Sequence, residues 1–233
     1  MEEVDILQPP LFTVSGKIKT RQQAYEDGDW VGAFNLWIVS NDPVPSVVYQ
    51  QRSPQSTWAP NLLDVTAGGH YQAGEKLTDG LREVDEELGK QYKIDDVVYL
   101  GRKMYVGFNT DGTSHNNVVD VYMIEDSSPL SSYQLEEAEV YALCKCPVSE
   151  LLKAHEDETY TFKTVALTAK GKEIEIEVSK KSFPENWDNY HYKIAILADR
   201  YFKGEKTYCT NSSTLSRNVI LHCYYSHIVV YFG

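Results

Sequence analysis

The chain has 233 residues, of which 42% are apolar and 24% are charged, so it is long enough to bury a full hydrophobic core. Its formal net charge of −12 argues against nucleic acid or an anionic membrane as the main partner, because no basic patch is present to bind phosphates. No apolar run reaches the roughly 18 residues of a membrane span, so we expect no membrane partner.

The cysteines and the N-terminal stretch bear on the compartment. The chain has four cysteines: Cys144, Cys146, Cys209 and Cys223. They are few for a disulfide scaffold, and the single residue between the first two does not fit a zinc knuckle. Residues 1–10 lack both the basic and the apolar part of a signal peptide. We therefore expect free thiols and a cytoplasmic protein.

The first part of the chain predicts a lead-in followed by strands. Residues 1–28 form the lead-in, in which residues 17–26 favour a strand that ends in a turn. Trp30–Ser40 and Ser46–Arg52 are rich in aromatic and β-branched residues and flank a proline-rich turn, so they predict a hairpin. Residues 62–66 predict a short strand that leads into a glycine-rich loop.

A short helix is predicted after this loop, ahead of Gly89, with Thr78 or Asp79 as its cap. Its apolar residues are three and four positions apart and share one face: Leu81, Val84 and Leu88. Its glutamates have the same spacing and share another face: Glu83, Glu86 and Glu87. Three carboxylates on one turn repel one another, and Mg²⁺ or Mn²⁺ would relieve this repulsion and bind a substrate phosphate. A solvated acidic helix is the simpler interpretation of Glu86 and Glu87 taken alone.

The rest of the chain predicts further strands and two helices. Strands are expected over residues 94–100, 103–107 and 117–124, with a turn at 109–113, and another strand follows the acidic residues 136–139. A helix is expected over residues 148–155, a hairpin within 159–179 and an amphipathic helix over 188–202. No Asp or Glu occurs beyond Glu205, and this tail has no functional interpretation.

The loop and helix together resemble the Nudix box, the signature of the Nudix hydrolase superfamily. The residues that match the box are Gly69, Glu75, Arg82, Glu83, Val84, Glu86, Glu87 and Gly89. Two features depart from it. Six residues instead of seven separate Glu75 from Arg82, which puts the direction of Glu75 in doubt, and Lys90 stands where an apolar residue is usual.

The region before the box resembles the branch of the superfamily close to isopentenyl diphosphate isomerases. The motifs that carry this resemblance are Gln51-Arg52-Ser53, Trp58-Ala59-Pro60 and Ala67-Gly68-Gly69-His70. Those isomerases use a cysteine where this chain has Gly69, and glutamates where it has His115 and Asn117. We therefore do not expect isomerase activity.

The resemblance implies an α/β/α sandwich with a mixed sheet, whereas the patterns alone predict only a mixed α/β fold. It divides the chain into four segments: lead-in 1–28, Nudix core 29–158, a C-terminal hairpin and helix over 159–203 that pack on the core, and a tail of unclear origin, 204–233.

The resemblance also assigns roles within the box. It implies that Mg²⁺ or Mn²⁺ is bound by Glu83, Glu86, Glu87 and the backbone of Gly69. It implies that Arg82 orients a neighbouring glutamate and that Glu75 stabilises the loop or adds an outer ligand. The remaining box-loop residues are Gly68, Gly74 and Gly89.

A general base and substrate contacts are expected outside the box as well. Glu137 matches an acidic stretch of this branch and is one candidate base, with Glu87 as its rival. Arg52 either binds a phosphate or forms a structural ion pair. Trp58 either contacts the substrate or packs in the core, and His70 either lines the metal pocket or structures the loop.

We expect a metal-dependent hydrolase in which water attacks the pyrophosphate bond of a nucleoside diphosphate linked to another moiety, or of a similar small-molecule diphosphate. A non-catalytic module that binds a nucleotide is the main alternative. Work on RNA is disfavoured by the charge of −12, and the sequence leaves a homodimer open.

Overall fold

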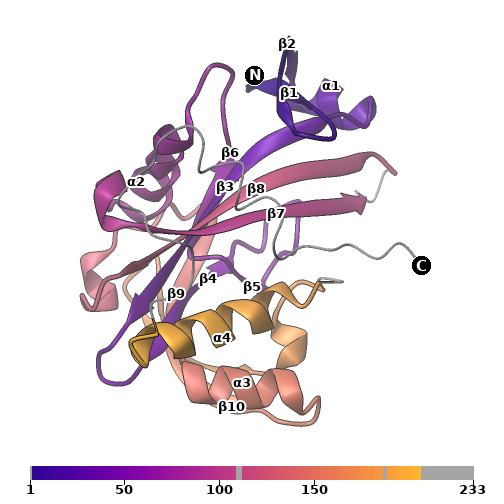
Figure 1. Cartoon of the computed structure of the whole chain (residues 1–233). Helices are drawn as coiled ribbons and strands as arrows, with labels where there is room; N and C mark the ends of the chain where they lie inside the picture. Colours follow the sequence, from indigo (N-terminus) through magenta and orange to yellow (C-terminus); the bar gives the residue numbers. More distant parts are fainter. Residues whose placement is uncertain (1, 109–111, 186–187, 206–233) are drawn as a thin grey trace.

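The computed structural model describes residues 2–108, 112–185 and 188–205 and contains one mixed sheet of eleven strands (Figure 1). The strands are β1 (Glu3–Gln8), β2 (Thr13–Thr20), β3 (Trp30–Ser40), β4 (Ser46–Arg52), β5 (Leu63–Asp64), β6 (Ala67–His70), β7 (Val98–Phe108), β8 (Ser114–Glu125), β9 (Val140–Pro147), β10 (Phe162–Thr168) and β11 (Glu173–Val178). The α-helices are α1 (Arg21–Glu26), α2 (Arg82–Leu88), α3 (Val148–Glu156) and α4 (Tyr190–Phe202). Short 3₁₀ helices are η1 (Leu77–Leu81), η2 (Ile94–Asp96), η3 (Leu130–Ser132) and η4 (Lys180–Ser182).

Strand β3 is the centre of the sheet. One of its edges pairs in parallel with β8 along almost its whole length. Its other edge is divided among three antiparallel partners, which are β1 at residues 30–31, β6 at 33–36 and β4 at 38–40. The partner of this edge therefore changes from β6 to β4 near Trp37.

The two faces of β3 contribute to two separate cores. One face carries Ala33, Trp37 and Val39 and packs with residues of α3 and α4. The opposite face carries Phe34, Leu36 and Ile38 and packs with Val84 and Leu88 of α2. This alternation is the period-two pattern of a strand buried on both sides. The predicted α/β/α sandwich is confirmed, with α3 and α4 side by side on one face (Figure 1).

Most of the strong patterns correspond to the observed elements. Strands β3 and β4 have the predicted bounds, and α3 and the β10–β11 hairpin lie where helix and hairpin were expected. The predicted turn at 109–113 and the predicted tail lie largely outside the described residues. Among the helices that the structure describes, none is long and apolar enough to cross a membrane.

Two local predictions were wrong. Residues 17–26 do not form one strand, because Thr20 ends β2 and starts α1 through a reciprocal capping box with Gln23. The two strands expected between residues 94 and 107 are one strand, β7, after a 3₁₀ turn. Its pairing with β8 shifts register around Gly101, whose φ of 134° suits glycine.

The N-terminus of α4 buries a histidine among aromatic rings. His191 is only 3% exposed, and its ring lies 5.8 Å from the ring of Trp37 and 5.1 Å from that of Phe183. Within the described residues neither ring nitrogen has a hydrogen-bond partner, and Nε2 lies 3.9 Å from a carboxylate oxygen of Asp64. Burial lowers the pKa of His191 to about 4. The folded protein therefore keeps this imidazole neutral where the unfolded chain binds a proton.

We predict that His191→Phe reduces the pH dependence of stability. Because the folded pKa lies below the unfolded value, His191 favours folding above about pH 6.5, and this contribution is lost as the pH falls toward 4. Between about pH 7.5 and pH 5 the group accounts for a loss of about 2 kcal/mol of unfolding free energy. Urea unfolding of both proteins at the two pH values measures it. An identical pH dependence in the variant would contradict the assignment.

Candidate active site

Helix α2 is short and has a defined start and end. The prediction that Thr78 or Asp79 caps this helix was wrong, because α2 follows Leu81, which makes no side-chain capping bond. Asp79 lies within η1, where its carboxylate accepts a hydrogen bond of 2.8 Å from the backbone N–H of Lys76. Gly89 ends α2 with a φ of 61° and donates its N–H to the carbonyl of Asp85 at 2.9 Å. This left-handed conformation is the one that glycine adopts at helix ends.

Glu87 points from α2 into the sheet and is only 4% exposed. Its carboxylate accepts a hydrogen bond of 3.1 Å from the side-chain amide of Gln50 on β4, and the backbone N–H of Gly68 on β6 also favours its charged form. It therefore lies where β3 changes partner. Burial, with the charges of Glu139 and Glu83, raises the pKa of Glu87 well above its usual range, and the charge of Arg52 opposes this shift.

Glu83 is packed against the backbone of Gly69. A Cβ at position 69 would lie 2.3 Å from Cδ of Glu83 and within 2.5 Å of both carboxylate oxygens, so a side chain there would force this carboxylate to move. Burial raises the pKa of Glu83 to about 7; Arg82 opposes the shift, and Glu86 and Glu139 add to it. Glu83 and Glu87 thus form a partly desolvated acidic pair on one side of Gly68 and Gly69.

Arg82 is bound by three acidic side chains. Its guanidinium lies 2.9 Å from Glu75, 2.9 Å from Glu83 and 2.8 Å from Glu86. The shortened spacing in the box therefore still directs Glu75 toward Arg82. Glu86 is turned outward, with 54% of its side chain exposed. Within the described residues, no three Asp, Glu, His or Cys side chains converge closely enough to hold one ion.

The donor set nevertheless suits a hard divalent cation. The groups beside Gly69 are carboxylate oxygens, which Mg²⁺ and Mn²⁺ prefer, and the close approach of Glu83 to the glycine backbone forms a cradle that a side chain would fill. Burial raises the pKa values of Glu83 and Glu87, and the neighbouring acids add to both shifts, so an excess of negative charge there is poorly compensated. A cation would relieve this excess, and Glu86 would have to leave Arg82 to join the pair.

The box loop is anchored by the N-terminal strand. The carboxylate of Asp5 on β1 accepts a hydrogen bond of 2.7 Å from the N–H of Gly74, and the carbonyl of Glu3 accepts one of 2.8 Å from the N–H of Ala73. Gly74 has a φ of 83°, a conformation that favours glycine. Residues assigned to the lead-in thus hold the loop in place.

Lys90, the second departure from the box, has its own partners. Its ammonium lies 3.4 Å from the carboxylate of Asp126 and 4.6 Å from the ring centre of Tyr133. The hydroxyl of Tyr92 donates to the same carboxylate at 2.7 Å. Asp126 and Tyr133 thus provide partners for the charge of Lys90, at a position where the box usually has an apolar side chain.

Glu137, the predicted candidate base, lies in the loop before β9. Its side chain is 60% exposed and pairs with Lys170 at 2.7 Å. Glu139 is the acid whose charge acts on Glu83 and Glu87. Its backbone carbonyl accepts a hydrogen bond of 2.9 Å from the N–H of Ser53, which fixes the residue just before β9 beside the end of β4. The sequence signal for Glu139 was its place as the last acid before that strand.

Two of the three predicted substrate-binding residues, Arg52 and Trp58, are in direct contact. Arg52 donates a hydrogen bond of 2.9 Å to the carbonyl of Trp58, and its charge also acts on Glu87. His70 pairs with Ala33 and so lies on the opposite face of the sheet from Gly69. It contacts the hydroxyl of Tyr25 at 2.7 Å. Burial, aided by Arg21, lowers the pKa of His70 to about 3, so it stays neutral.

An aromatic group that the sequence analysis missed lies beside His70. The rings of Tyr25 and His115 are stacked with centroids 4.5 Å apart. The ring of Trp58 lies 6.5 Å from that of His115 and 5.7 Å from that of Tyr105. The members come from α1, β7, β8 and the loop after β4, so no local pattern in the sequence could have grouped them.

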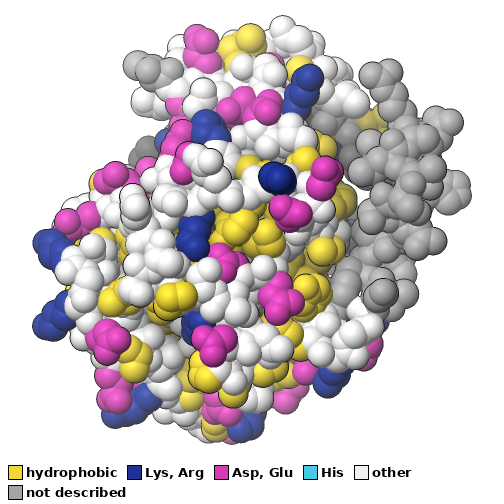
Figure 2. All heavy atoms as spheres, turned by 90° about the vertical axis from the view of Figure 1, so that its left-hand side faces the viewer, with side chains coloured by type: hydrophobic (Ala, Val, Ile, Leu, Met, Phe, Trp, Pro, Cys, Tyr) yellow, Lys and Arg dark blue, Asp and Glu magenta, His cyan; other side chains and the backbone are white. Residues whose placement is uncertain are grey.

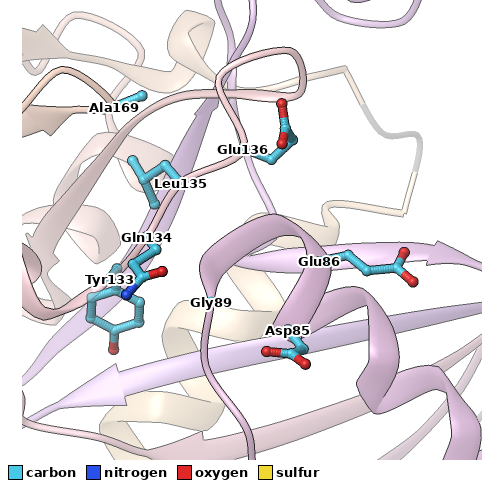
Figure 3. A pocket seen from close by; sticks show the side chains of 8 residues that line it. All are labelled: Asp85, Glu86, Gly89, Tyr133, Gln134, Leu135, Glu136 and Ala169. Carbon is cyan, nitrogen blue, oxygen red and sulfur yellow. The ribbon is translucent and has the colours of Figure 1, made fainter.

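An open hollow of about 530 Å³ borders the outer side of α2 (Figure 3). Its lining includes Asp85 and Glu86 from the helix and Glu136 from the loop before β9. The N–H of Glu136 donates to the carbonyl of Glu87 at 2.9 Å, which fixes this loop against the helix. The lining is acidic, and the face around α2 carries no continuous basic patch (Figure 2), so a phosphate would require a cation here.

We predict that Gly69→Ala destabilises the protein through contact with Glu83. The added methyl would lie 2.3 Å from the carboxyl carbon, which should cost about 1–3 kcal/mol of unfolding free energy. The same change in a Glu83→Ala background should cost less than about 0.5 kcal/mol, because the obstacle is gone. Urea unfolding of the four proteins measures the coupling. Equal costs in both backgrounds would refute this contact.

Comparisons with known proteins agree with the geometry. A family model described as the NUDIX domain matches residues 30–166. An uncharacterised Nudix hydrolase of Clostridium acetobutylicum is 31% identical over 139 residues, which are 58% of this chain and 66% of that protein. The uncharacterised Nudix hydrolase YfcD of Escherichia coli is 41% identical over 54 residues, 23% of this chain and 30% of that protein. The chain thus spans less than two thirds of either relative.

Among solved structures, DR0079 from Deinococcus radiodurans has a TM-score of 0.49 and 22% identity, over 65% of this chain and 87% of that one. The resemblance seen in the sequence is confirmed at the level of the superfamily, and the isomerase-like branch stays a prediction. Because the family model covers more than half of the 233 residues, the chain belongs to the Nudix family.

Proposed function

We propose that this protein is a metal-dependent pyrophosphohydrolase that acts on a nucleoside diphosphate linked to another moiety, or on a similar organic diphosphate. The observation that carries the proposal is the acidic pair, Glu83 and Glu87, held against Gly68 and Gly69 with raised pKa values. Family membership supports the reaction class. The substrate remains open, because neither acid of the pair would contact the leaving group.

The proposed metal site uses Glu83, Glu87 and the backbone of Gly69, with Glu86 joining from the exposed side of α2. Bound Mg²⁺ or Mn²⁺ would neutralise phosphate charge and make a bound water more acidic. Arg82 would hold Glu83 in place, supported by Glu75. Gln50 and the N–H of Gly68 would fix the orientation of Glu87.

A general base must take the proton of the attacking water. We assign this role to Glu139, whose side chain is exposed and forms no salt bridge with another described residue. Its negative charge acts on both Glu83 and Glu87. Glu87 is its rival, as the sequence suggested. Arg52 stands at the end of β4 with its charge acting on Glu87, which suits contact with a substrate phosphate.

A nucleotide-binding module without catalysis is the second candidate. The observation that favours it is the outward position of Glu86, bound to Arg82, so that no three acids converge in the described part of the chain. Nucleoside diphosphates linked to sugars, amines or a second nucleoside, incubated with Mg²⁺ or Mn²⁺, distinguish the two. Release of a nucleoside monophosphate that EDTA stops supports the hydrolase, whereas binding without release supports the module.

Two further aspects are part of the proposal. We place the protein in the cytoplasm, where the buried thiols of Cys144 and Cys146, 3.7 Å apart, would stay reduced. We also propose a small-molecule substrate rather than nucleic acid, given the net charge of −12.

We predict that Glu87→Gln lowers kcat about 100-fold or more with Mg²⁺. The amide has nearly the same shape, and removing a buried charge should leave the unfolding free energy unchanged or higher. Glu137→Gln is the matched control and should stay within about twofold of the wild type, because the exposed Glu137 forms a surface ion pair with Lys170. Monophosphate release at saturating substrate measures both, and a full rate for Glu87→Gln would defeat the proposed site.

We predict that Glu139→Gln lowers kcat about 100-fold while KM changes little, since a general base acts in the transition state rather than in substrate binding. Steady-state kinetics on the best substrate of the panel, with Glu137→Gln alongside, measures the difference. If Glu139→Gln and Glu137→Gln behave alike, Glu87 becomes the base.

A further inference from the structure

We infer that Tyr190 on α4 is a positioning residue for Glu87, and that it acts across the sheet through Asn35 and Gly68. This inference rests on the proposed function only in taking Glu87 as a metal ligand. Tyr190 lies outside residues 30–166, the part of the chain that the family model matches. The C-terminal helix would then be a support of the metal site, beyond its packing role.

The first contact joins α4 to β3. The Tyr190 hydroxyl accepts hydrogen bonds of 3.0 Å from the side-chain amide of Asn35 and 2.8 Å from the indole N–H of Trp37. Tyr190 is only 6% exposed, and the ammonium of Lys103 lies 3.5 Å from its ring centre. The hydroxyl is therefore fixed in position and receives both donors from one face of β3.

The second contact joins Asn35 to the glycine loop. Asn35 pairs with Gly68 across β3 and β6. A Cβ at Gly68 would lie 2.6 Å from the side-chain oxygen of Asn35, so the carboxamide packs directly on the glycine backbone. The orientation of this carboxamide, set by Tyr190, thus limits where the Gly68 backbone can lie.

The third contact reaches the acidic pair. The backbone N–H of Gly68 favours the charged form of the Glu87 carboxylate, which is buried and accepts a hydrogen bond of 3.1 Å from the Gln50 amide. Partners that orient a metal-binding side chain from outside the metal shell typically change metal affinity about 10- to 100-fold when removed. If the hydroxyl of Tyr190 is lost, Asn35 and Trp37 lose their acceptor, and the carboxamide is free to turn away from Gly68.

The test compares Tyr190→Phe with Tyr192→Phe in the full chain. Tyr192 is on the same helix, and its hydroxyl contacts Glu156 at 2.8 Å on the exposed side, so it is the matched control. Free Mn²⁺ measured by electron paramagnetic resonance gives the affinity without any turnover. We expect Tyr190→Phe to weaken Mn²⁺ binding about 10-fold, Tyr192→Phe to change it less than about 2-fold, and excess Mn²⁺ to restore most of kcat in Tyr190→Phe.

A second variant guards against a merely structural effect. Asn35→Ser leaves the bond between Tyr190 and Trp37 in place but is too short to reach both partners, and it should weaken Mn²⁺ binding by a similar factor. If Tyr190→Phe unfolds more easily but binds Mn²⁺ like the wild type, the inference is overturned. If the wild type binds Mn²⁺ but cleaves no diphosphate, the proposed function fails. The comparison of Mn²⁺ affinities between Tyr190→Phe and Tyr192→Phe still tests the role of Tyr190. A wild type that binds no Mn²⁺ overturns both.

Discussion

A carboxylate buried in the sheet is the constraint on which the rest of this structure depends. Glu87 leaves α2 and enters the place where β3 exchanges β6 for β4, and it meets one donor from each of the two strands. Burying an acid is costly unless it is hydrogen-bonded or paired with positive charge. The amide of Gln50 and the backbone of Gly68 lower this cost, whereas the charges of Glu83 and Glu139 raise it.

Charge balance in the box follows from the same constraint. Arg82 is shared by Glu75, Glu83 and Glu86, so one guanidinium partly neutralises three carboxylates. Its contact with Glu75 is made although one residue is missing between the two, in a stretch that contains η1. Spacing within the helix fixes which acids face the sheet, while the junction tolerates a change of length.

The sequence predicted best where a pattern is local and strong. Strand β3 and helix α3 follow from apolar periodicity, and the glycine-rich loop with three glutamates sufficed to find the box. It failed where two local preferences compete, as at Thr20, where a capping interaction ends a strand. It could not separate the acids before β9, because long-range contacts decide between them: the charge of Glu139 acts on the acidic pair, whereas Glu137 pairs with Lys170. The contact of Tyr190 with Asn35 joins residues 155 positions apart, beyond any window of sequence reading.

The hydrogen bonds from β1 to the box loop bear on where this fold can be cut. A shortened protein that starts at Trp30, the first residue of the family match, would lack the acceptors that Asp5 and Glu3 offer to Gly74 and Ala73. It would also uncover the edge of β3 at Val31, where β1 now pairs. An open edge of this kind pairs with strands of other molecules, so the excised domain would aggregate. Its box loop would also lose two of the hydrogen bonds that hold it in one conformation.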